Sequence, residues 1–236
     1  AIVSFVRALL HDGAGSGFLD DLDGFVRRIA PAGWWNALAR VVLHLASPGT
    51  PDVYQGNELW SHSLVDPDNR RPVDYALREK LLAELDAGAD PAALLETAAD
   101  GRIKLWVTSR TLRARRADAA LWREGRYTPL HATGARAAHV VAFARELDGH
   151  AAIAVAPRLP WALGGATGRA PVGPEIWGDT AVALPPHLAG RRWTCALSGD
   201  NVESPLDAHG NSLRLADVCR VLPVALLQSS GTQVAH

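Results

Sequence analysis

Residues 47–58 read Ser-Pro-Gly-Thr-Pro-Asp-Val-Tyr-Gln-Gly-Asn-Glu, and this stretch decides the predicted fold. Its Pro and Gly residues end the apolar pattern that precedes it. Asp52-Val53-Tyr54 is then a run of strand length, and a polar, charged loop follows from Asn57 to Pro72. A short apolar strand that leads into a polar loop is how a β/α barrel presents its functional site. The stretch therefore predicts a barrel strand at 52–54 with a site loop after it.

Upstream of this stretch, apolar residues recur with the spacing of a helix. One stripe lies within residues 2–10, a second within residues 18–29 and a third within residues 34–45. The glycine-rich residues 11–17 separate the first two stripes, and Pro31 separates the last two. We therefore expect three helices, of which the third is deeply buried because it is apolar nearly all round.

The sequence after the loop is again helical as far as residue 124. Asp74 is a predicted N-cap for a helix that carries a leucine at every fourth position. Pro91 suits the first turn of a short second helix, and a longer third helix is expected from about Ile103 to Trp122.

From Tyr127 onward the apolar pattern changes towards a period of two. Residues 138–143 and 151–156 read as strands, and Asp148-Gly149 between them predicts a tight hairpin. Residues 158–178 are rich in Gly and Pro and are expected to form a long surface excursion. Further strands are expected at 180–184, 192–197 and 220–227.

The predicted fold class is therefore α/β plus β, in two domains. Residues 1–124 would form a helical part with one strand. Residues 125–236 would form a small antiparallel β-sandwich.

Composition excludes several classes of protein. The 24 Lys and Arg nearly balance the 25 Asp and Glu, which argues against nucleic-acid binding as the main task, and no block of like charge suggests an interaction tail. No apolar run approaches the ~18 residues that a membrane-spanning helix needs. Cys195 and Cys219 are too few for a disulfide scaffold, and the histidines lack metal-ligand spacing. We expect a cytoplasmic protein with buried, reduced cysteines and neither metal nor cofactor.

The start of the sequence has an unusual character. The chain contains no methionine, and it opens within an apolar helical pattern that no capping residue precedes. We interpret it as a piece of a longer protein.

The loop after the predicted strand gathers carboxylates, arginines and aromatic rings. Charged groups of this kind bind vicinal sugar hydroxyls through charge-assisted hydrogen bonds, and aromatic faces provide an apolar platform for a pyranose ring. Loop charges that merely pair with one another and brace the loop are the competing interpretation. The candidate sugar-binding residues are Tyr54, Trp60, Asp68, Asn69, Arg70 and Arg71.

The amino-acid sequence of this region resembles that of a known family. Residues 47–58 are similar to the eighth-strand segment of the α-amylase superfamily barrel, in which PGxPxxYxGxE is usual. Residues 64–74, Leu-Val-Asp-Pro-Asp-Asn-Arg-Arg-Pro-Val-Asp, are similar to the maltooligosyl trehalose synthases. The barrel motif alone indicates only the superfamily, whereas the second stretch and later ones indicate the synthases. Those later stretches lie at 101–106, 125–130, 139–145, 154–158 and 177–180.

This resemblance implies a C-terminal fragment of a (β/α)8-barrel enzyme of trehalose biosynthesis. Residues 1–124 would then be the C-terminal part of the catalytic barrel with the helices that follow it, and residues 52–54 its eighth strand. Such an intramolecular transferase converts the reducing-end α-1,4 linkage of a maltooligosaccharide into an α,α-1,1 linkage by retaining transglycosylation. The catalytic carboxylates of such an enzyme lie upstream of the part of its sequence that this chain resembles. No residue of this chain is therefore expected to be catalytic, and the fragment alone is expected to be inactive. The resemblance assigns no catalytic role to the carboxylates of Asp52, Glu58, Asp66 and Asp68.

The resemblance also implies partners. These are a maltooligosaccharide substrate, the upstream barrel half of the same protein and, transiently, a trehalose-releasing hydrolase. Two other functions stay open: a non-catalytic glucan-binding or scaffold module, and a related α-glucan hydrolase or transferase. Glucan binding by residues 125–236 alone would favour the first of these, and product analysis would distinguish the second.

Overall fold

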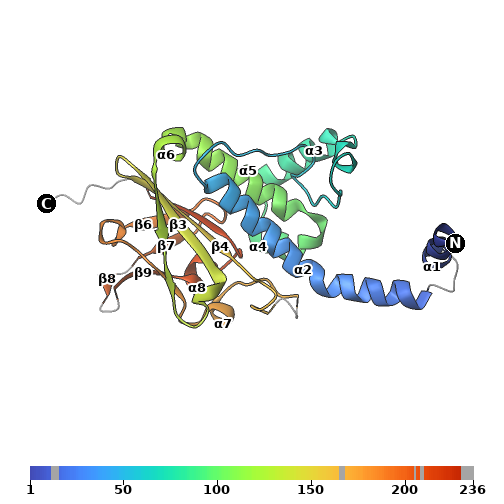
Figure 1. Ribbon diagram of the computed structural model, residues 1–236. Coiled ribbons are helices and arrows are strands. Elements are labelled where there is room, and N and C mark those ends of the chain that lie inside the picture. Colours follow the sequence, from blue (N-terminus) through green and yellow to red (C-terminus); the bar gives the residue numbers. More distant parts are fainter. Residues whose placement is uncertain (12–15, 165–167, 205, 208–209, 230–236) are drawn as a thin grey trace.

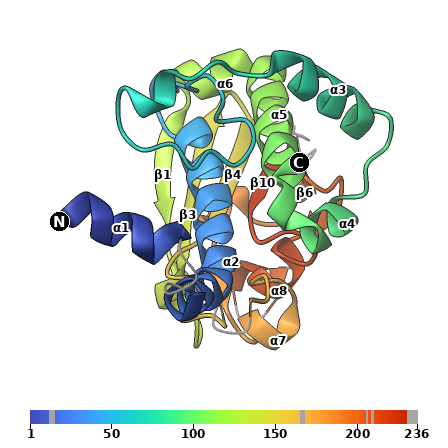
Figure 2. The ribbon, with the colours of Figure 1, turned by 90° about the vertical axis from the view of Figure 1, so that its right-hand side faces the viewer.

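The computed structural model describes the chain except residues 12–15, 165–167, 205, 208–209 and 230–236 (Figure 1). Two long helices lie against an antiparallel sheet, and α2 and α5 are neighbours in both views (Figures 1 and 2). No helix within the described residues is long and apolar enough to cross a membrane. The helices are α1 (Ile2–His11), α2 (Ser16–Ala46), α3 (Tyr75–Asp86), α4 (Pro91–Glu96), α5 (Arg102–Ala117), α6 (Ala119–Glu124), α7 (Pro174–Trp177) and α8 (Leu215–Val218).

Helix α2 corrects the prediction of two helices divided by Pro31. It is one helix of 31 residues with Pro31 inside it. A proline removes one backbone hydrogen bond and strains one turn. The turns that follow it are held by burial, since Trp35, Leu38 and Val42 are at most 2% exposed. Tertiary packing therefore overrides the local break signal.

The predictions around the other helices are confirmed with one correction. The side chain of Asp74 caps α3 by accepting a hydrogen bond from the Leu77 N–H, as expected. Pro91 begins α4. The single helix predicted from Ile103 to Trp122 is instead two, because Asp118 ends α5 and its side chain caps α6. A good N-cap residue within an apolar pattern thus started a new helix.

The predicted strand at 52–54 is wrong for this chain. Residues 51–54 form no strand and no turn. A strand needs a neighbour to satisfy its backbone groups, and no strand of the described chain pairs with this segment. The Nε2 atom of His44 takes part of that role, since it lies 3.1 Å from the Asp52 backbone N and 2.9 Å from its carbonyl oxygen.

The later part of the chain forms two antiparallel sheets. The six-stranded sheet has the order β1-β3-β4-β10-β6-β7, and the four-stranded sheet has the order β2-β5-β9-β8. The first comprises β1 (Arg126–Leu130), β3 (Val140–Leu147), β4 (His150–Pro157), β10 (Ala225–Ser229), β6 (Arg192–Cys195) and β7 (Asn201–Glu203). The second comprises β2 (Ala132–Thr133), β5 (Ala181–Ala183), β9 (Gly210–Arg214) and β8 (Leu206–Asp207). Packing of the two sheets as a sandwich stays a prediction, and so does the domain boundary at residue 124.

Most of the predicted strands are confirmed in outline. Strands β3 and β4 pair in register from Val140↔Pro157 to Leu147↔His150, around the expected turn. Asp148 and Gly149 both have positive φ, 47° and 85°, as a two-residue hairpin turn requires. The strand predicted at 220–227 is displaced, because α8 ends just before it and β10 begins only at Ala225.

One hydrophobic cluster joins the helices to the sheet. It runs from Trp35 and Leu38 on α2 to Leu226 and Leu227 on β10. Residues 158–178 are not wholly a surface excursion, since Leu163 and Trp177 in it are 4% and 1% exposed. Cys195 and Cys219 are buried and free, as predicted.

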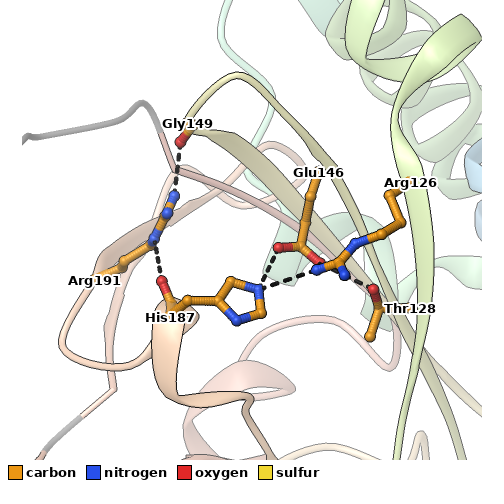
Figure 3. A network of polar contacts seen from close by, with 6 residues as sticks. All are labelled: Arg126, Thr128, Glu146, Gly149, His187 and Arg191. Carbon is orange, nitrogen blue, oxygen red and sulfur yellow. Dashed lines mark hydrogen bonds and ion pairs between the residues drawn. The ribbon is translucent and has the colours of Figure 1, made fainter.

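A polar network fastens the connection between β5 and β6 to the main sheet (Figure 3). Glu146 on β3 is the centre of this network, and its side chain is 13% exposed. His187 Nε2, Arg126 and Thr128 all donate hydrogen bonds to its carboxylate, the first at 2.5 Å. Arg191 adds a bond to the Gly149 carbonyl in the β3–β4 turn at 2.7 Å.

This network makes stability depend on pH. Burial disfavours the charged form of Glu146, but hydrogen bonds from His187 and Thr128 outweigh it and hold the pKa of Glu146 below its ordinary value. A carboxyl group with a lowered folded-state pKa stabilises the fold above its unfolded pKa, about 4.3. That contribution is lost as the pH falls through the folded-state pKa.

Glu146→Gln is therefore expected to lower the free energy of unfolding by about 1 kcal/mol at pH 7. The difference from wild type should shrink as the pH falls through the folded-state pKa of Glu146, because the wild-type carboxyl group then becomes neutral, like the glutamine amide. Urea titrations at pH 7 and pH 3 measure it. A difference that is the same at both pH values would contradict the assignment.

Candidate functional site

The loop between α2 and α3 encloses a hollow of about 490 Å³. The loop lies in front of α2 and α5 in Figure 2, and Arg78 on α3 completes the wall. Polar side chains and backbone dominate the lining, so it suits a ligand that carries many hydroxyl groups. The lining residues are 54–57, 60–64, 69, 71–74 and 78.

Four of the six predicted sugar-binding residues line this hollow. They are Tyr54, Trp60, Asn69 and Arg71. Tyr54 is 41% exposed and offers its ring at the rim. Asn69 holds its Oδ1 atom without a hydrogen-bond partner although that atom is buried. An unpaired amide oxygen beside a polar hollow is available to accept a hydrogen bond from a ligand hydroxyl.

The other two predicted residues, Asp68 and Arg70, lie outside the lining and brace the loop. Arg70 pairs with Asp66, its Nη2 lying 2.7 Å from Oδ2. Asp68 accepts a hydrogen bond from the Leu64 backbone N–H at 2.7 Å and pairs with Arg71. The ion-paired bracing that competed with sugar binding is therefore present, and a sugar-binding role for these residues stays a prediction.

Trp60 lines the hollow and also packs against the helices behind the loop. One face of its ring stacks on Trp34 of α2, with 6.3 Å between ring centroids and 15° between planes. Its indole N–H donates to the Ala98 carbonyl at 2.7 Å. Trp60 thus fixes the loop to the helices, and its predicted contact with sugar stays a prediction.

Arg78 was not found from the sequence, yet it holds the loop in place. Its side chain is 17% exposed and its Nε lies 2.8 Å from Glu58 Oε2. The same guanidinium donates to the Gly56 carbonyl at 2.9 Å and to the Asp74 carbonyl at 3.0 Å. Its position four residues after the N-cap Asp74 was the only signal in the sequence.

Lys104 on α5 is a second anchor from outside the loop. Its Nζ donates to the Leu59 carbonyl at 3.1 Å and lies 5.6 Å from the centroid of the Trp60 ring. Burial lowers the pKa of Lys104, the nearby Arg40 lowers it further, and Glu58 raises it in part.

The hollow can bind hydroxyl groups but lacks the groups for glycosyl transfer. Retaining transfer needs two carboxylates about 5–5.5 Å apart. Of the described residues that line the hollow, only Asp74 carries a carboxylate, and its Oδ1 caps α3. The part of the chain that the structure describes also holds no cluster of three His, Cys, Asp or Glu residues able to bind a metal ion.

Comparison with known proteins shows what this chain is similar to. No protein-family model matches the chain. The putative maltooligosyl trehalose synthases of two Mycobacterium tuberculosis strains are 42% identical over 128 residues, which is 54% of this chain. The chain spans only 15% of the length of these curated relatives.

Solved structures agree with the sequence relatives. The maltooligosyltrehalose synthase from Arthrobacter ramosus aligns with 95% of this chain at 37% identity and a TM-score of 0.72. The alignment covers 25% of that protein. An Anoxybacillus α-amylase, at 16% identity and a TM-score of 0.50, shares the fold alone. In sequence and in fold, this chain is therefore homologous to one part of the maltooligosyl trehalose synthases.

Proposed function

We propose that this chain provides one wall of a glucan-binding site in an enzyme that makes trehalose-terminated maltooligosaccharides. The whole enzyme would convert the reducing-end α-1,4 linkage of its substrate into an α,α-1,1 linkage. The observation that carries this proposal is the 37% identity over 95% of the chain to the Arthrobacter synthase. The retaining carboxylates would come from the rest of the enzyme, since the hollow has none in a reactive pair.

The wall would bind and position the sugar. Tyr54 offers an aromatic ring, Asn69 an unpaired amide oxygen, and Arg71 a guanidinium with a side chain that is 78% exposed. Such an enzyme must retain the freed glucose and must keep water out of its site for as long as the glycosyl-enzyme intermediate exists. Hydrogen-bonding groups and an aromatic ring on a braced loop suit that task, because they hold the sugar without chemistry of their own.

An uncovered apolar face supports the presence of a further part of the protein. Helix α1 and the first half of α2 extend beyond the body of the molecule (Figure 1). Large apolar side chains there are between 39% and 80% exposed, which is far more than a helix in a finished domain shows. We propose that the remainder of the barrel covers them. They are Ile2, Val3, Phe5, Val6, Leu10, Phe18, Leu22, Phe25, Val26 and Ile29.

Arg71→Ala tests the site assignment directly. Chemical-shift titration of the 236-residue chain with maltopentaose should give saturable shifts at residues of the hollow. Loss of one charge-assisted hydrogen bond should weaken this binding about tenfold in Arg71→Ala. Arg116→Ala, an exposed arginine at the far end of α5, is the matched control and should bind like wild type. Equal affinity of the Arg71 variant and wild type would refute the role of Arg71.

A further inference from the structure

A second pocket of about 180 Å³ lies between α2, α5 and the segment that precedes the site loop. It is separate from the hollow, although Tyr54 and Asn57 line both. Its volume is several times the roughly 30 Å³ that one water occupies, so it has room for a small polyatomic ligand.

Helical spacing explains which side chains meet in this pocket. Arg40 and His44 are four residues apart on α2, and Lys104 and Thr108 are four residues apart on α5. Residues at this spacing share a helix face. Because α2 and α5 lie side by side, the two pairs line opposite walls of one pocket.

Two of these side chains are cations that repel each other. Arg40 lies close enough to Lys104 to lower its pKa, in addition to the effect of burial. Arg40 has no ion pair or hydrogen bond among the described residues. Lys104 uses one of its three N–H donors on the Leu59 carbonyl. Several cationic N–H groups therefore have no protein acceptor among the described residues.

The nearby carboxylates leave these cations only partly neutralised. Glu58 is committed to Arg78 at 2.8 Å, although it still raises the pKa of Lys104. Asp52 lines the pocket, and its backbone N and carbonyl oxygen contact the His44 ring. An oxyanion seated between Arg40 and Lys104 would relieve their repulsion.

Thr108 adds an independent sign that the pocket takes a ligand. Thr108 is one of the residues that line the pocket and is 5% exposed, and its buried Oγ1 has no hydrogen-bond partner. A buried hydroxyl without a partner is costly unless something binds to it. A hydroxyl beside two cations is suited to donate a third hydrogen bond to an oxyanion.

We propose that this pocket is a binding site for a small oxyanion of the phosphate class, held by Arg40, Lys104 and Thr108. The tetrahedral phosphate group accepts several charge-assisted hydrogen bonds at once, which matches donors on opposite walls. Either free inorganic phosphate or the phosphate group of a sugar phosphate has this chemistry. The site is distinct from the glucan hollow and does not depend on the function proposed for it.

The test is a chemical-shift titration of the 236-residue chain with inorganic phosphate, at constant ionic strength kept with sodium chloride. Backbone amides at Arg40, Lys104 and Thr108 should shift and saturate together. A parallel titration with glucose 6-phosphate distinguishes the two sources of the group, and glucose is the uncharged control. Saturation with either phosphate compound, but not with glucose, supports the site and identifies its source.

Three variants make the result specific. Arg40→Gln should weaken binding about tenfold, because it removes a charged donor. Thr108→Val, which keeps the shape of the side chain, should weaken it about fivefold. Arg27→Gln removes an equal charge from the exposed first half of α2 and should bind like wild type. Absence of saturable shifts, or equal affinity of Arg40→Gln and wild type, overturns the proposal.

Discussion

Replacing Arg145 by methionine is expected to lower the free energy of unfolding by about 3 kcal/mol. Arg145 lies on β3 and is 1% exposed, yet no carboxylate pairs with it among the described residues. Its guanidinium donates to three backbone carbonyls instead, those of Ala46 at 3.3 Å, Trp122 at 3.0 Å and Gly125 at 2.9 Å.

These acceptors explain why the effect should be large. The Ala46 carbonyl ends α2, and the carbonyls of Trp122 and Gly125 lie where α6 leads into the sheet. Carbonyl groups near a helix end have no partner within the helix. Methionine fills similar volume but leaves them buried and unsatisfied, at about 1 kcal/mol each. Burial lowers the pKa of Arg145, and the charge of Arg115 adds to this effect.

Urea denaturation followed by tryptophan fluorescence measures the Arg145→Met effect. Arg192→Met, on the exposed face of β6, is the matched control and should change the free energy by less than about 0.5 kcal/mol. Similar unfolding midpoints for the two variants would show that Arg145 does not join the helices to the sheet.

Arg78→Met is expected to release the site loop while leaving the rest of the fold in place. The variant removes three hydrogen bonds at once and leaves Glu58, which is 25% exposed, without its partner. We expect a loss of about 2–3 kcal/mol in stability, because all three bonds come from a charged guanidinium and one of them is a partly buried ion pair. Maltopentaose binding should weaken by tenfold or more, since Arg78 both lines the hollow and holds the loop that forms the rest of it.

Two further proteins separate these effects. Lys80→Met lies on the same helix, with a side chain that is 73% exposed, and should match wild type in stability and in binding. A double-mutant cycle of Arg78→Met with Glu58→Gln should give a coupling energy of about 1–2 kcal/mol. Coupling near zero, with unchanged maltopentaose binding, would contradict the anchoring role of this pair.

The sequence predicted the caps and turns correctly, because these depend on residues that are close together in the chain. The cap at Asp74, the start of α4 at Pro91 and the Asp148-Gly149 hairpin all follow from short-range hydrogen bonds or backbone preferences. The position of the loop hollow was also predictable. Four of the six residues chosen for it line it, because they lie within twenty residues of one another on a single loop.

The sequence did not predict the features that depend on contacts between residues far apart in the chain. Pro31 was read as a break because its local cost is visible, whereas the burial of Trp35 and Leu38 is set by the sheet. The segment 52–54 was read as a strand, but a strand forms only beside another. Apart from the hydrogen bond of Arg78 to the Asp74 carbonyl, the contacts of Arg78 and Arg145 join residues 20 or more positions apart, so no local pattern could indicate them.

The products of a chimeric enzyme test the proposed function most directly. In the chimera, this chain would replace the homologous quarter of the Arthrobacter ramosus synthase. Proton NMR of maltopentaose would follow the reducing-end anomeric signals with the chimera and with this chain alone. We predict that the signals persist with the chain alone, and that with the chimera they give way to a trehalose-type anomeric signal. Conversion by the chain alone, or release of glucose without a trehalose signal by the folded chimera, would contradict the proposal.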